Sequence, residues 1–163
     1  MVGGKEDQVL DQLLEAWRTN NRINLFLINR ISAAGMRCTL SKRGGRDVAR
    51  QFAHLHNVRV WHLEKRAKDL AIGLEVFPTE STPKKAQLRA ALNASSDAVE
   101  KFLAGVLSGE PKRRGMKKGV FTTLGYLIAH ESHHRGNILL TIKQCGHNID
   151  QNDRYAIWAW DQI

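Results

Sequence analysis

The stretch HESHHRGN, residues 130 to 137, concentrates the side chains of this sequence that bind metals most readily. His130 and His134 are four residues apart, so on an α-helix they share one face and lie about one turn from each other. Two imidazoles at this spacing can bind a single divalent ion. The first five letters also read HExxH, the signature of zinc proteases. The stretch therefore indicates either a protease or another kind of metal site.

The protease interpretation requires features that the rest of the chain lacks. One class of zinc protease adds a glutamate ligand downstream, but Glu131 is the last glutamate of the sequence. Another class continues as HExxHxxGxxH, and here Asn137 and Leu140 stand at the glycine and histidine positions. No strand pattern is present to hold an extended peptide beside the helix. We therefore interpret Glu131 as a coincidental match to the protease motif.

A third metal ligand has to come from another part of the chain. The segment 46–68 offers His54, His56 and His62. On a helix His54 and His56 point about 160° apart, so at most one of these two can bind the same ion as the HxxxH pair. Two histidines from one helix and one from a neighbour would leave positions open for water or substrate, which is the arrangement of catalytic metals.

Four long segments carry the helical period, and no segment alternates convincingly with the period of a strand. The pattern predicts an all-α protein, a four-helix bundle, in which helices cover about residues 6–33, 46–68, 83–107 and 121–145. Thr82 followed by Pro83 predicts the N-cap and first residue of the third helix, and Gly146 predicts a left-handed end for the fourth. In the short C-terminal tail, Trp158 and Trp160 are expected to cover an open end of the bundle or to meet a second subunit.

Several polar residues lie near the predicted histidine face or interrupt an apolar one. Tyr126 and Asn137 fall within about 40° of His130 on the fourth helix, so each is a candidate to assist a reaction there. Asn21 and Asn24 interrupt the apolar face of the first helix and indicate a polar pocket or a hydrogen-bonded contact between helices. Arg135 points away from the histidine face, which favours a structural ion pair, and His133 is expected to have a structural role beside the site.

The composition is that of one globular domain, spanning residues 1–163, with 42% hydrophobic and 25% charged residues. Cys38 and Cys145 form no CxxC pair, so neither a disulfide framework nor a thiolate zinc site is indicated, and a cytoplasmic location fits best. The chain has no apolar run of membrane-spanning length.

The net charge of +9 would suit a protein that binds nucleic acid. The densest basic run, residues 112–118, lies among Pro and Gly, however, and is interpreted as a solvated loop.

Three stretches together resemble a known family. HLHNVR at residues 54–59, HESHHRGNI at 130–138 and the closing IWAWDQI resemble the DinB-like proteins, a superfamily of metal-dependent enzymes that includes bacterial thiol S-transferases. The resemblance covers essentially the whole chain and implies a single four-helix bundle with a long connection between helices. It implies that His54, His130 and His134 bind the metal. Asn137 departs from the family, in which glutamine is common at this position.

The resemblance also implies zinc or nickel as the ion, with a low-molecular-weight thiol as a further cofactor for a thiol transferase. Neutral imidazoles suit both metals. A hydrolase is the other reaction expected from such a site. The alternative from another class is a non-catalytic metal-binding protein of a stress response, which binds nucleic acid through its basic surface. A small-molecule substrate and a homodimer are expected, and nucleic acid is the less favoured partner.

Overall fold

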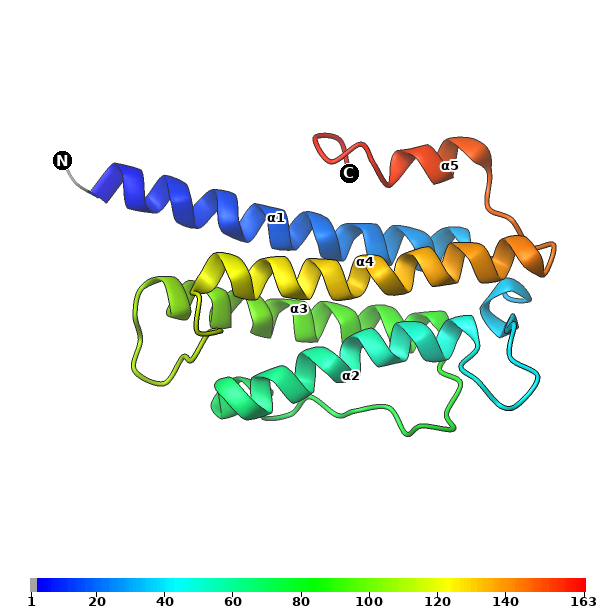
Figure 1. Ribbon diagram of the computed structural model, residues 1–163, viewed down its shortest axis with the longest axis horizontal. Helices are drawn as coiled ribbons and strands as arrows, with labels where there is room; N and C mark the ends of the chain where they lie inside the picture. The colour runs from blue at the N-terminus through cyan, green and yellow to red at the C-terminus, as the bar shows by residue number, and fades with distance from the viewer. Residues whose placement is uncertain (1–2) are drawn as a thin grey trace.

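The structure is a computed structural model that describes residues 3–163, and it is all-helical (Figure 1). The long helices are α1 (Gly3–Arg30), α2 (Val48–Arg66), α3 (Lys85–Leu107) and α4 (Val120–Gln144). A short helix, α5 (Gln151–Ala156), and two 3₁₀ turns, η1 (Gly35–Arg37) and η2 (Lys68–Ala71), complete the elements. No strand occurs within residues 3–163, so the prediction of an all-α four-helix bundle is confirmed.

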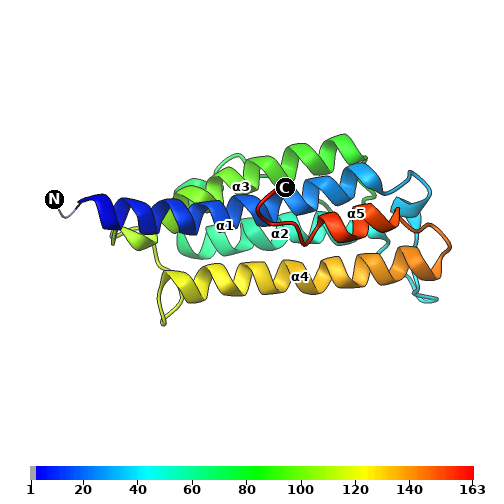
Figure 2. The same cartoon turned by 90° about the horizontal axis from the view of Figure 1, so that it is seen from above.

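The helices α1 and α4 run in one direction, and α2 and α3 run in the other (Figures 1 and 2). Because α2 and α3 are parallel, the chain must return along the whole bundle between them. Residues 67–84 make this return and lie alongside α2 (Figure 1). This segment is the long connection that the family resemblance implied.

The helix ends follow local capping chemistry, with one correction to the sequence prediction. At the start of α2 the Asp47 carboxylate accepts a hydrogen bond from the Arg50 backbone N–H at 2.8 Å. The start predicted at Thr82–Pro83 is wrong, because α3 begins at Lys85 after an extended Lys84 whose N–H donates to Gln87 Oε1. A proline disfavours the helical conformation of the residue before it, but it does not fix where the helix begins after it.

The end of α4 agrees with the sequence prediction. Its C-cap is Cys145, and Gly146 follows with φ of +74°. This left-handed conformation is strained for residues that carry a Cβ, which is why glycine terminates the helix here.

The core consists of two apolar halves separated by a polar layer. The first half, near the η1 end, includes Ile28, Phe52, Leu88 and Ile138. The second half lies toward the other end and has its own set of buried side chains, including Trp17, Leu63, Phe102 and Leu127. Between the two, each of the four long helices contributes buried polar side chains, namely Asn20, Asn21, Asn24, Arg59, Ser95, Ser96, Glu131 and Arg135.

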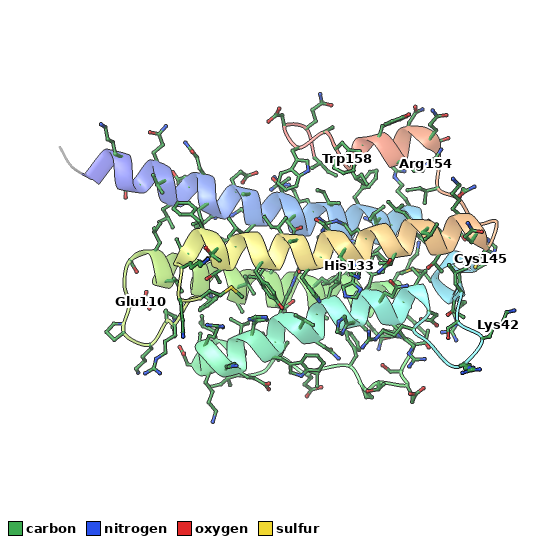
Figure 3. The ribbon with its side chains drawn as sticks, in the orientation of Figure 1. Lys42, Glu110, His133, Cys145, Arg154 and Trp158 are labelled. Carbon is green, nitrogen blue, oxygen red and sulfur yellow. The ribbon has the colours of Figure 1, made fainter. Side chains whose placement is uncertain are left out.

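The C-terminal tail does not cover an end of the bundle, as the sequence had suggested it could. The tail folds back beside α1 (Figure 2), where the Ile163 carbonyl accepts a hydrogen bond from Arg22 Nε at 2.8 Å. Trp158 keeps 76% of its surface exposed and lies beyond α5, far from the middle of α2 (Figure 3). The alternative expectation, contact with a second subunit, stays a prediction.

Candidate metal centre

Three histidines from two helices meet on one side of the polar layer. His54 comes from the middle of α2, and His130 and His134 come from successive turns of α4. Their ligand nitrogens all lie within 4.8 Å of one another, and all three side chains are half-buried. The ring centres of His54 and His130 lie 4.8 and 4.7 Å from that of His134. The structure thus brings together the trio that the sequence pattern and the resemblance indicated.

The protonation state of this cluster suits a metal ion. Burial, followed by the nearby positive charge of Arg46 and by His130, lowers the pKa of His54 to about 4. Burial and the neighbouring His130 and His54 lower the pKa of His134 to about 4, and burial also lowers that of His130. At neutral pH the three rings are therefore uncharged and have lone pairs available for a cation.

The ring nitrogens of the trio also lack competing partners. No hydrogen bond to these nitrogens is found among the described residues, and the half-buried side chains leave them open to a metal ion or to water. A 4.8 Å spread is wider than the separation of about 3.4 Å between ligand atoms around a tetrahedral ion with bonds of about 2.0–2.1 Å. Small side-chain rotations would close the set, so the residues present fit a divalent transition metal.

The two other histidines of α2 serve different purposes. His56 is 1% exposed and lies between two carbonyl oxygens, that of Ala91 at 2.9 Å from Nδ1 and that of Glu75 at 3.0 Å from Nε2. It therefore ties α2 to α3 and to the long connection. His62 packs near Tyr126, with ring centres 5.2 Å apart. The choice between His54 and His56 that the sequence left open falls on His54.

Tyr126 and Asn137, the two residues expected to assist a reaction, lie at different places beside the trio. The Tyr126 ring stacks 6.3 Å from that of His130 and is 43% exposed, so it lies at the rim of the site. The Asn137 amide is instead 3.1 Å from His133 Nε2, and both of these side chains are exposed. Asn137 thus orients His133, whose ring lies 5.3 Å from that of His134, on the edge of α4 marked in Figure 3.

Glu131, interpreted from the sequence as a coincidence, is a central residue of the core. It is 2% exposed, and its two oxygens accept a pair of hydrogen bonds from one edge of the Arg59 guanidinium, at 2.6 Å from Nε and 3.0 Å from Nη2. Asn20 and Asn24 donate to Oε2 of the same carboxylate at 2.6 and 2.7 Å. The match to the protease motif is indeed coincidental, since Glu131 faces the core, but the residue itself is structural.

The ionisation of Glu131 follows from these partners. Burial raises the pKa of its carboxyl group, but Arg59, Arg135 and the hydrogen bonds from Arg59 and Asn24 outweigh burial and leave the pKa below its usual value. The carboxylate is therefore charged at neutral pH. It balances an Arg59 side chain that is completely buried and stacks over the Trp17 ring at 4.7 Å.

The remaining polar residues of the layer complete this network. Arg135 donates to Asn20 and Asn24 at 2.8 and 3.0 Å, which is the structural role that its direction on the helix indicated. Asn21 accepts a hydrogen bond from Arg59 at 2.9 Å and donates to Asn93. Of the two interpretations of the asparagine interruption, the hydrogen-bonded contact between helices is the one observed.

Two features outside the bundle core are the basic run and the pair of cysteines. In the basic run, Arg113 forms ion pairs with Asp69 and Glu110, so part of its charge is balanced by these carboxylates.

The two free cysteines, distant in sequence, are neighbours in space. Burial and a hydrogen bond with Cys145 raise the pKa of the Cys38 thiol to about 11. Figure 3 shows Cys145 at the same end of the molecule as Lys42.

Fold and site together define a class of protein, a four-helix bundle with a histidine trio that could hold a metal ion. The sequence matches the DinB family over residues 5–162, nearly the whole chain. The protein therefore belongs to the DinB family. No curated protein and no solved structure matches the chain significantly. None of the helices in the part of the chain described is long and apolar enough to cross a membrane.

Proposed function

We propose that His54, His130 and His134 bind one divalent transition metal ion and that the protein is a metal-dependent enzyme, either a thiol S-transferase or a hydrolase. One observation carries the proposal: three uncharged imidazoles converge within 4.8 Å and have no protein partners among the described residues. Zinc and nickel are the ions we favour, because neutral nitrogen ligands suit both.

The ligand set determines what the ion would supply. Three neutral ligands leave its double charge undiminished, so a bound thiol or water would lose a proton near neutral pH. The chain's own residues would then orient the reactants. We expect Tyr126, at the rim beside His130, to donate a hydrogen bond to charge that develops on a substrate. Asn137 contributes less directly, because its amide holds His133 beside His134.

The metal site is tested by elemental analysis of the purified protein and of two variants. The wild type is expected to contain close to one equivalent of zinc or nickel, and His54→Ala is expected to lose it. His147→Ala is the matched control, because His147 is exposed and lies at the far end of α4, beyond its last turn. Saturating zinc at about 100 times the Kd should stabilise the wild type and the control by about 2.7 kcal/mol. Equal metal content in all three proteins would refute the site.

The reaction is tested separately from the metal. A panel of low-molecular-weight thiols with electrophilic substrates, and a panel of esters, amides and phosphate esters, distinguish transferase from hydrolase. The proposal expects turnover with one panel, loss of turnover on chelation, and recovery on addition of metal. Turnover that survives both chelation and His54→Ala would contradict it.

A further inference from the structure

A cleft opens beside the histidine trio, between α2 and the long connection. Its volume is about 230 Å³, and His54 is one of its lining residues. Trp61 and the segment 76–78 form apolar walls, and Arg46 and Arg50 line the end nearest the start of α2. The cleft therefore joins the candidate metal centre to two cationic side chains.

The wall formed by the connection is held in place by α2. The Asn57 amide donates to the Phe77 carbonyl at 2.8 Å and accepts from the Phe77 N–H at 2.9 Å. On the neighbouring residue of α2, His56 Nε2 lies 3.0 Å from the Glu75 carbonyl oxygen. Because both contacts use main-chain atoms of the connection, the cleft is formed before any ligand arrives, which reduces the entropic cost of binding.

Carboxylates of the protein balance the charge of the two cleft arginines only weakly. The Arg50 side chain is 15% exposed, and its buried Nε has no hydrogen-bond partner among the described residues. Its one ion-pair partner there, Glu80, is 3.4 Å away and 85% exposed, so this pair is weak. Arg46 has no carboxylate within 4.0 Å in residues 3–163. Guanidinium groups that line a cleft and have little balancing charge are suited to bind an anionic oxygen group.

The arrangement favours a carboxylate over a phosphate. The cleft offers two guanidinium groups, one of them weakly paired with Glu80, and the two oxygens of a carboxylate can accept hydrogen bonds from both. The N-terminus of α2, which could otherwise contribute backbone N–H groups to a phosphate, is occupied by the Asp47 carboxylate. Arg50 and His54 are four residues apart, about 6 Å along the helix axis, so the carboxylate would lie a few bonds from the atom that reacts.

We propose that this cleft is the substrate pocket, that Arg46 and Arg50 bind a substrate carboxylate, and that an apolar part of the same molecule packs on Trp61 and Phe77. The proposal rests on the proposed function, because it assigns the reacting end of the substrate to the side of His54. It names the chemical class of substrate that the histidine site would act on: a small carboxylic acid with an apolar group.

The test is calorimetric titration with phenylacetate and with phenylacetamide, its neutral counterpart of nearly the same shape, in the presence of a chelator. The chelator prevents the carboxylate from binding a metal ion directly. Phenylacetate is expected to bind at least about tenfold more tightly than the amide, a difference of about 1.4 kcal/mol. Arg46→Met and Arg50→Met should each remove most of this preference, and Arg43→Met, an exposed arginine of the preceding loop, should retain it.

Each result decides the matter. Equal binding of the acid and the amide would overturn the proposal, and so would a preference for the acid that persists in both cleft variants. Inorganic phosphate that binds more tightly than phenylacetate would overturn the carboxylate assignment. Arg46 is exposed, so its variant is informative even if Arg50→Met fails to fold. A carboxylate preference in a protein that contains no metal as purified and gains no stability from added zinc would sustain the cleft proposal and refute the proposed function. A metal-dependent reaction in a protein without the carboxylate preference would sustain the proposed function and refute the cleft proposal.

Discussion

Glu131 is the residue whose replacement tests the polar layer most directly. In Glu131→Gln the side-chain volume is kept, but the negative charge that balances Arg59 is lost. The amide group must also direct N–H donors at positions where Arg59, Asn20 and Asn24 already donate. Arg59 is completely buried and would be left as an unbalanced charge in the core.

The magnitude follows from the burial of both partners. Removing one member of a buried ion pair typically costs about 3–5 kcal/mol, because the other charge stays desolvated. For a chain of this length, each kcal/mol corresponds to about 2–4 °C in Tm. Glu131→Gln is therefore expected to lower Tm by about 6–20 °C and to unfold at a clearly lower urea concentration.

The assay is urea and thermal unfolding followed by circular dichroism, with Glu64→Gln as the control. Glu64 is an exposed residue of α2, so losing its charge should change stability by no more than about 0.5 kcal/mol. In a double-mutant cycle, Glu131→Gln and Arg59→Met should together cost at least about 1 kcal/mol less than the sum of the single changes. A Glu131→Gln protein within about 1 kcal/mol of wild type would refute the account of this layer.

Three further predictions address the helix ends, the connection and the histidines. Gly146→Ala should lower the free energy of unfolding by about 1 kcal/mol or more, because Gly146 has φ of +74°. Gly125→Ala should raise it by about 0.5–1 kcal/mol, because Gly125 lies inside α4 with open space around an added Cβ. Urea unfolding measures both changes. His56→Ala should lower the protection of the Glu75–Phe77 amides in hydrogen exchange, while His147→Ala leaves it unchanged. Folding lowers the pKa values of His54 and His134 from 6.5 to about 4. Between these two pH values the unfolded chain binds more protons than the folded protein does. The metal-free protein should therefore lose stability as the pH falls from about 6.5 to about 4. A Tm that is flat across this range in the metal-free protein, but falls in His54→Ala, would contradict the assignment.

The sequence predicted the helices well because their apolar residues repeat with the helical period. In α1, Leu14, Trp17 and Ile28 repeat with this period and are all buried. It placed helix ends less well, and it gave no sign that α5 exists. The start of α3 at Lys85 depends on a hydrogen bond between Lys84 and Gln87, which no apolar pattern records.

The site was partly predictable for a similar reason. Spacing placed His130 and His134 on one face, and geometry excluded His54 and His56 acting together, but the choice of His54 came from the family resemblance. What spacing could not reveal is the role of Glu131, because a charged residue on a helix is normally assigned to solvent. The signal was present in the asparagines of α1, since buried amides require partners and Glu131, Arg135 and Arg59 were the charges able to meet them.

The polar layer and the histidine trio are linked through the rotation of α4. Glu131 and Arg135 lie about 100° around this helix from His130 and His134, one residue further along in each case. Apolar packing alone tolerates alternative rotations of a helix in a bundle, whereas a buried ion pair with defined hydrogen bonds tolerates very few. By holding Glu131 against Arg59 of α2, the layer also sets the face of α4 that meets His54, which lies on the same helix as Arg59. The proposed three-ligand site therefore gives this bundle a physical reason to place charges in its core, at a level along α4 that coincides with the two histidines.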